Sequence, residues 1–133
     1  FKMSGGEISG NSDSGVFVYY GIFEMSGGTI SGNTATYNGG GVYVSSGRFE
    51  MSGGEISGNT ASSWGGGVYV EGTFIKQSGG TIYGSTASDS LKNTAGGDSY
   101  GHAVFVSSLS TKKRNTTAGV GVTLNSGSTG GWE

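Results

Sequence analysis

The 133-residue sequence contains no cysteine and no proline, and only 32% of its residues are hydrophobic. Without cysteine, the chain has neither a disulfide framework nor a zinc–thiolate site. The 30 glycines without any proline exclude a collagen triple helix. No stretch approaches the ~20 apolar residues of a transmembrane helix, so no membrane span is expected in this segment. The low hydrophobic content favours a fold with a narrow core over a compact globule.

One sequence motif recurs along the chain. It reads FEMSGGEISGN from Phe49 and is followed by GGGVYV from Gly65, with close copies of the first part at Phe1 and Phe23. The glycine pairs succeed one another at steps of 22, 26 and 26 residues. A period in the twenties that combines β-forming residues with glycine pairs is typical of a solenoid, in which each repeat forms one coil.

Each coil is expected to contain three short strands. In the coil that begins at Val42 these are Val42–Val44, Phe49–Met51 and a strand centred on Ile56. Alternation within the first two strands predicts that Val, Val, Phe, Met and Ile point inward. The sequence therefore predicts an all-β fold, a right-handed parallel β-helix of about four to five coils with 22–26 residues per regular coil.

The repeat spacing also assigns the less regular C-terminal part. Each valine strand is followed by a glycine pair 11 residues later, which places Ile75 in the Phe column, Gln77 in the Met column and Lys76 outward beside Glu50. Residues 1–106 are expected to form the coils, with an inserted loop at 85–100. Residues 107–133 are expected to form a modified terminal coil or a C-terminal edge or cap, because terminal solenoid units must cover the core.

A column of asparagines follows the third strand of successive coils. It contains Asn11, Asn33 and Asn59, and Ser85 is expected to interrupt it. Stacked amides can hydrogen-bond from coil to coil, as asparagine ladders do in cross-β stacks. We therefore expect a structural ladder here rather than a ligand site.

The repeated motifs resemble those of a known group of proteins. GGGV at Gly39 and Gly65, with F-x-M-S at Phe23 and Phe49, is similar to the paired GGAI and FxxN repeats of polymorphic outer-membrane-protein adhesins. Ser26 and Ser52 stand where the FxxN motif has Asn. The Gly/Ser/Asn-rich repeat proteins that bacteria export to their surfaces are more similar still. The resemblance implies a right-handed parallel β-helix, an extracellular or cell-surface location, and adhesion or scaffolding.

Residues arranged for catalysis or metal binding are scarce. His102 is the one histidine and has no cysteine partner, which favours a packing or surface role. Glu7 and Glu55 share an outward column about 9.6 Å apart, near the upper limit for inverting glycosidases, but on a flat face without a cleft. The glycine–aspartate repeat that binds calcium is absent. We predict no catalytic residue, no cofactor and no metal site, and expect that the protein is not an enzyme.

Aromatic residues occupy one outward column. The column contains Phe17, Tyr43, Tyr69 and Phe105, and Tyr37 and Trp64 lie on the variable loop beside it. Stacked aromatics stabilise a sheet, and an exposed aromatic stripe binds sugars or a partner surface; both interpretations stay open. Ice binding on the Ser/Thr columns is less favoured, because Glu7 and Glu55 interrupt the Thr column.

Charge is distributed unevenly along the chain. Residues 1–75 contain six acids and two bases, a net charge of −4, whereas residues 76–133 contain five bases and three acids, a net charge of +2. Opposite charge at the two ends of a stack favours head-to-tail contact. Nucleic acid is not an expected partner, since the net charge is −2 and Lys112–Arg114 is a single basic run, interpreted as a solvated tail.

The sequence thus predicts a non-enzymatic structural or adhesive segment of a secreted or cell-surface bacterial protein. Because Phe1 begins directly in a core strand, end-to-end self-association into filaments is expected as well. The alternative is a module that binds carbohydrate or a host surface through the aromatic stripe. An ice-binding or polysaccharide-active β-helix is less favoured.

Overall fold

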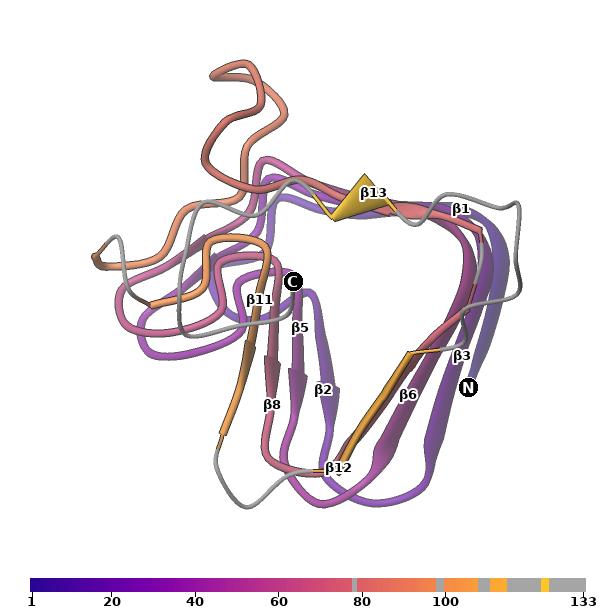
Figure 1. Ribbon diagram of the computed structural model, residues 1–133. Coiled ribbons are helices and arrows are strands. Elements are labelled where there is room, and N and C mark those ends of the chain that lie inside the picture. The colour runs from indigo at the N-terminus through magenta and orange to yellow at the C-terminus, as the bar shows by residue number, and fades with distance from the viewer. Residues whose placement is uncertain (78, 98–99, 108–110, 115–122, 125–133) are drawn as a thin grey trace.

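The computed structural model describes residues 1–77, 79–97, 100–107, 111–114 and 123–124. Within these ranges the regular structure is all β, and the paired strands run parallel. Figure 1 looks along the axis of the stack: the path runs anticlockwise as it advances toward the viewer, which is right-handed. The predicted parallel β-helix is confirmed. Four successive rungs of one sheet correspond to about three complete turns.

The coils are built from three sheets. The first contains β1 (Lys2–Ser9), β3 (Ile22–Ser31), β6 (Arg48–Ser57), β9 (Thr73–Lys76), β10 (Thr81–Ile82), β12 (Thr111–Arg114) and β13 (Thr123–Leu124). The second contains β2 (Val16–Val18), β5 (Val42–Val44), β8 (Val68–Val70) and β11 (Val104–Val106). The third is the pair β4 (Thr34–Ala35) and β7 (Thr60–Ala61). No helix long and apolar enough to cross a membrane occurs in the described ranges.

In β1, β3 and β6 the strands predicted as second and third are halves of one bent strand, whereas β9 and β10 are separate strands. In β3 and β6 the pairing register shifts at the glycine pair, where the chain turns a corner of the triangular outline in Figure 1. Gly54 has a φ of +84°, and a Cβ added there would lie 2.8 Å from the carbonyl oxygen of Gly28 in the coil before. Only glycine fits this corner, because it tolerates positive φ and allows the coils to approach closely.

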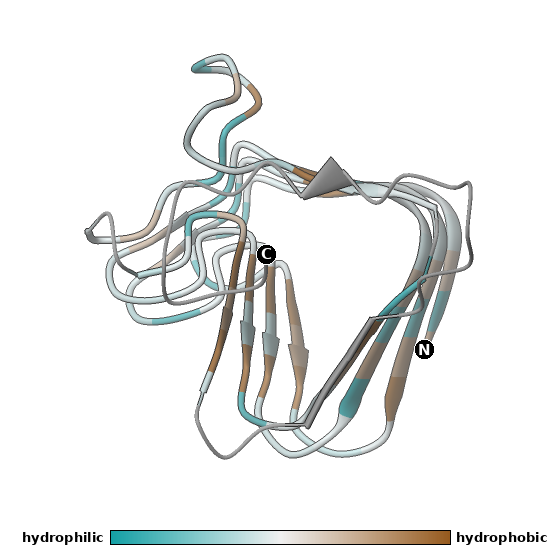
Figure 2. Cartoon of the chain, in the orientation of Figure 1, coloured by the Kyte–Doolittle hydropathy of each residue, from teal (hydrophilic) through white to brown (hydrophobic). Residues whose placement is uncertain are grey.

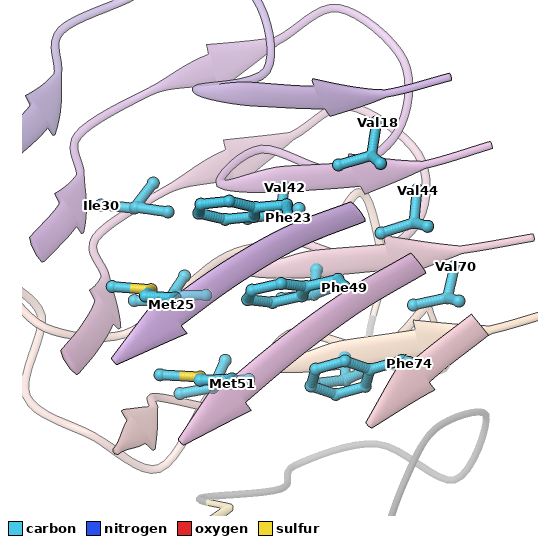
Figure 3. Close-up of a cluster of buried hydrophobic side chains, with 14 of the residues drawn as sticks. Val18, Phe23, Met25, Ile30, Val42, Val44, Phe49, Met51, Val70 and Phe74 are labelled. Atoms are coloured by element: carbon cyan, nitrogen blue, oxygen red, sulfur yellow. The ribbon is translucent and has the colours of Figure 1, made fainter. Parts of the chain in front are cut away.

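Identical side chains stack above one another in the core, and the repeat spacing predicted the Phe23–Phe49 pair. Phe23 stacks on Phe49 with ring centroids 4.9 Å apart, and Phe49 stacks on Phe74 at 5.1 Å. Figure 3 shows these rings between the Met25–Met51 column and the valines of the second sheet. The brown, hydrophobic segments in Figure 2 lie on the same strands. The core is a narrow axial column, which explains how a chain with few apolar residues can bury enough surface.

The last coil differs from the predicted register by one residue. Phe74, not Ile75, pairs with Phe49, and Lys76, not Gln77, pairs with Met51. The corner before Phe74 is one residue shorter than in the coil before, and the stretch after Lys76 is one residue longer. The deletion and the insertion cancel in the 11-residue spacing, which is why the sequence pattern concealed them.

Lys76 consequently lies in the core rather than in the outward charged column. Its side chain is fully buried, in the column occupied by Met25 and Met51 in the coils before it. Its Nζ donates to the carbonyl oxygens of Gln77, at 3.1 Å, and of Gly79. The extra residue after Lys76 brings these carbonyls to the ammonium, which a buried charge requires.

The asparagine column continues farther than expected. Oδ1 of Asn33 accepts hydrogen bonds from N and Nδ2 of Asn11, Oδ1 of Asn59 accepts the same pair from Asn33, and Oδ1 of Asn93 accepts them from Asn59. Asn93, not Ser85, therefore occupies the fourth position, although it comes 34 residues after Asn59. The predicted interruption by Ser85 was wrong, because the chain makes an excursion and then returns to the column.

That excursion is the protruding loop at the top of Figure 1. It occupies residues 85–92 rather than the whole of 85–100, since Thr94 forms a parallel bridge with Thr60 and Gly96 N donates to the carbonyl oxygen of Ser63. The basic run Lys112–Arg114 was interpreted as a solvated tail, but its backbone forms β12 and pairs with β9. Most of the expected terminal segment 107–133 lies outside the described residues.

Candidate functional site

Four aromatic residues form a continuous row on the outer side of the second sheet. Phe17, Tyr43, Tyr69 and Phe105 lie at the centres of β2, β5, β8 and β11 and are direct partners in the parallel register. Neighbouring ring centroids are 5.0, 5.1 and 5.6 Å apart along the row. Because the flanking valines point into the core, the rings point away from it. We call these four residues the aromatic row.

Exposure changes steeply along the row. Phe17 is 57% exposed, whereas Tyr69 is only 6% exposed. Trp64 packs its ring against Phe105 at 6.0 Å and against Tyr100 at 5.7 Å, so the C-terminal half of the row has an aromatic cover. The outward stripe expected from the sequence is thus accessible at Phe17 and partly covered at Tyr69 and Phe105.

Glu71 links the two tyrosines of the row. Its carboxylate accepts hydrogen bonds from the hydroxyl groups of Tyr43, at 3.2 Å, and Tyr69, at 3.1 Å. Burial, followed by the negative charge of Glu71, raises the pKa of Tyr69 to about 12. The same causes raise the pKa of Tyr43. Glu71 therefore fixes the orientation of both rings while both hydroxyl groups keep their protons.

A pocket opens at the accessible end of the row. It has a volume of about 300 Å³. Phe17 and Tyr43 come from neighbouring rungs of the second sheet, and Tyr37 comes from the variable loop before β5. Polar side chains from the loops that precede β2 and β5 complete the lining of the pocket. The lining residues are Asp13, Ser14, Phe17, Tyr37, Asn38 and Tyr43.

Hydrogen bonds within the loops hold the polar side of this pocket. Asp13 Oδ1 accepts from Ser14 N at 2.8 Å, and Ser14 Oγ donates to the carbonyl oxygen of Asn38 at 3.2 Å. Asn38 Oδ1 accepts from Trp64 N at 3.3 Å. These contacts tie three successive loops together, so the polar groups have defined positions relative to the rings.

The residue before the GGG run differs between successive coils. Asn38 and Trp64 both directly precede the GGG run, and Gly39 N donates to the carbonyl oxygen of Trp64 between the two coils. Where Trp64 stands, its indole packs against the aromatic row. Where the smaller Asn38 stands, its side chain lines the pocket beside Phe17 and Tyr43.

Of the residues singled out in the sequence, the structure brings Phe17, Tyr37 and Tyr43 together around this pocket. Tyr69, Phe105 and Trp64 instead form the packed end of the same surface. Asp13, Ser14, Asn38 and Glu71 were not predicted. The one signal for Asn38 was its place in the repeat, where the next coil has Trp.

The other titratable side chains considered as candidates for catalysis or metal binding have structural surroundings in the described coils. His102 is buried, and its Nδ1 accepts a hydrogen bond from Ala95 N at 3.0 Å. Glu7 and Glu55 are separated in register by Thr29. Glu24 forms a 2.7 Å ion pair with Lys2, whose hydrogen bond lowers the pKa of Glu24. Among the described residues no group of three or more His, Asp or Glu side chains could hold a metal ion.

Comparison with known proteins does not assign the chain to a family. No protein-family model, curated protein or solved structure matches the chain. The resemblance of the GGGV and F-x-M-S motifs to surface adhesins therefore stays a prediction. What the chain does has to be inferred from its own residues.

Proposed function

We propose that the chain is a non-enzymatic structural and adhesive segment of a bacterial protein that acts outside the cell. The observation that carries the proposal is that the regularly repeated positions of each coil serve the structure. Regular positions are used for the core, as with Phe49, for the corners, as with Gly54, and for the ladder, as with Asn59. Several residues that vary from coil to coil lie in the loops beside the aromatic row, as with Asn38 and Trp64.

The exposed aromatic end supports an adhesive role. Phe17, Tyr19, Tyr20 and Tyr37 are 57%, 56%, 73% and 75% exposed. Phe17 and Tyr19 stack at 6.1 Å, and Tyr19 contacts Tyr20 at 4.4 Å, so the rings form one surface. Contiguous exposed apolar surface on a soluble protein marks interaction sites, and tyrosine is enriched in such sites because it combines apolar area with a polar tip.

Retention of protein-coated beads on cells under flow tests the adhesive role. Wild-type beads are expected to be retained, and a Tyr19→Ser/Tyr20→Ser variant is expected to lose most of this retention. Thr81→Ser is the matched control, because Thr81 lies in the first sheet, away from the aromatic surface. Equal retention of wild-type, variant and uncoated beads would refute adhesion by this surface.

Head-to-tail self-association stays a prediction that rests on charge. Residues 1–75 have a net charge of −4 and residues 76–133 a net charge of +2. Attraction between unlike ends weakens with ionic strength, because the Debye length falls from about 10 Å at 0.1 M to about 3 Å at 1 M salt. Sedimentation at these two salt concentrations, with electron microscopy of the low-salt sample, tests it; monomers in both would refute it.

A further inference from the structure

We propose that the pocket between Phe17, Tyr37 and Tyr43 binds one neutral sugar residue of a glycan. This inference rests on the proposed adhesive function and names its ligand. The pocket has about 300 Å³, at the lower end of the range of ~300–1,000 Å³ typical of small-molecule sites. A single sugar ring with its hydroxyl groups suits this size, whereas a drug-sized ligand would extend beyond it.

The rings offer the apolar contacts that a sugar ring needs. The faces of a pyranose expose C–H groups, which pack against the negative face of an aromatic ring. The ring planes of Phe17 and Tyr43 lie at 63° to each other, with their centroids 5.0 Å apart. The two rings therefore present differently oriented faces to a ligand. Tyr37 closes a further side from the variable loop. Flat amphipathic rings held at an angle distinguish a sugar from a flexible aliphatic chain.

The polar lining offers both an acceptor and a donor. Asp13 Oδ1 is engaged by Ser14 N, which leaves Oδ2 for a hydroxyl group of a ligand. Asn38 uses Oδ1 to accept from Trp64 N, which leaves its Nδ2 to donate. An acceptor and a donor in one small pocket match neighbouring hydroxyl groups of a sugar, each of which can donate and accept.

Charge selects the class of sugar. Asp13 is the one charged residue that lines the pocket. An acidic sugar or a phosphate group would meet this carboxylate at short range, and like charges at short range repel. The pocket therefore favours neutral sugars over uronic and sialic acids.

Glu71 acts as a positioning residue for this site. It lies outside the pocket lining but holds the hydroxyl group of Tyr43. With Glu71→Gln, a hydrogen bond to Tyr43 remains available, whereas Glu71→Ala removes it. If Glu71 acts through Tyr43, Glu71→Ala should weaken sugar binding and Glu71→Gln should largely restore it.

The repeat supplies a variant that removes the Asn38 amide, and with it the Nδ2 donor, from the pocket lining. Asn38→Trp introduces the residue that the next coil has at this position, so the fold already accommodates it there. Ser90→Trp is the control, because Ser90 is exposed on the protruding loop and is not part of the pocket lining. The wild-type chain and both variants would be tested on an array of neutral and acidic glycans, followed by calorimetry with the best neutral glycan.

Wild type and Ser90→Trp are expected to bind neutral glycans, and Asn38→Trp is expected to bind at least about tenfold more weakly, a loss of ~1.4 kcal/mol. Asp13→Asn should lower the ratio of the affinity for neutral glycans to the affinity for acidic glycans, because it removes the carboxylate. Unchanged affinity of folded Asn38→Trp, no binding of any neutral glycan by wild type, or a preference for acidic glycans would overturn the proposal. So would cell binding that depends on Asn38 but is insensitive to glycosidase treatment, which indicates a protein ligand.

Bead retention separates the two proposals. If wild-type beads are retained on cells through Tyr19 and Tyr20 while no glycan binds, the sugar site is refuted and the adhesive surface stands. If neither retention nor glycan binding is observed, both proposals fail.

Discussion

Asn33 donates two hydrogen bonds to a single oxygen of Asn59, one from its backbone N at 3.0 Å and one from its side-chain Nδ2 at 2.9 Å. Both residues are fully buried. Each side-chain amide oxygen thus accepts hydrogen bonds from the asparagine at the corner of the coil before it. The ladder connects successive coils at a point where the strands have ended. The repeat keeps Asn at this position because a shorter or apolar side chain would leave buried donors without an acceptor.

Removing Asn59 should therefore destabilise the whole stack. Asn59→Ala leaves two buried donors of Asn33 without their acceptor, and an unsatisfied buried group costs about 1–3 kcal/mol. We expect the free energy of unfolding to fall by roughly 3 kcal/mol in urea denaturation. Asn11→Ala is the control, because Asn11 is exposed. A similar loss in both variants would contradict the role of burial.

Gly54 and Gly5 belong to corner glycine pairs but differ in backbone conformation and in the space around an added Cβ. Gly54→Ala places a Cβ at a φ of +84° and 2.8 Å from the carbonyl oxygen of Gly28, whereas a Cβ at Gly5 meets nothing within 4 Å. Gly54→Ala should lower the free energy of unfolding by more than about 1 kcal/mol, through left-handed backbone strain and the clash. Gly5→Ala should leave it nearly unchanged. Equal stability of the two variants would show that the corner tolerates a side chain.

Met51 and Lys76 occupy the same core column, but their surroundings differ. Lys76 reaches carbonyl oxygens in the lengthened stretch after it, a stretch that the coil of Met51 lacks. Met51→Lys should therefore cost about 3 kcal/mol or more, because it buries an ammonium in an apolar site. Met51→Leu, which conserves volume, should cost less than about 1.5 kcal/mol. Denaturant titration of both variants measures the difference, and comparable losses would contradict this account of Lys76.

Alkaline pH should destabilise the fold through Tyr69. Its pKa is raised from 10.0 to about 12 in the folded state, so the folded chain retains a proton that the unfolded chain loses. The resulting stabilisation is fully present below pH 10 and decreases as the pH rises from about 10 to about 12. Tyr69→Phe should flatten this decrease in denaturant titrations at successive pH values. An unchanged slope in Tyr69→Phe would assign the loss to other groups.

The repeat made most of the fold predictable. Phe49, Met51 and Ile56 are buried as their alternation indicates, because a solenoid converts sequence period directly into stacked columns. The register around Lys76 was not predictable, since a deletion and an insertion of one residue cancelled in the spacing. Asn93 was hidden for a related reason, because the excursion at 85–92 separates it from Asn59 along the sequence.

The candidate site was predictable only in part. The outward aromatic row, including the stacking of Phe105 on Tyr69, follows from strand alternation, but the packing of the loop residue Trp64 on Phe105 does not. The pocket is lined by Asn38, at a position where the next coil has Trp64. Its lining combines residues from the loops before β2 and β5 with two rings of the aromatic row, and no single motif records this combination.

The central claim, that the chain binds without catalysing, is tested by incubating it with polysaccharides and measuring binding and chain length together. The account predicts that neutral polysaccharide is retained on immobilised protein and is recovered at its original length, with no new reducing ends. Release of reducing sugar that is abolished by Glu55→Gln would contradict the account, because it would place a catalytic carboxylate on the sheet that we describe as structural.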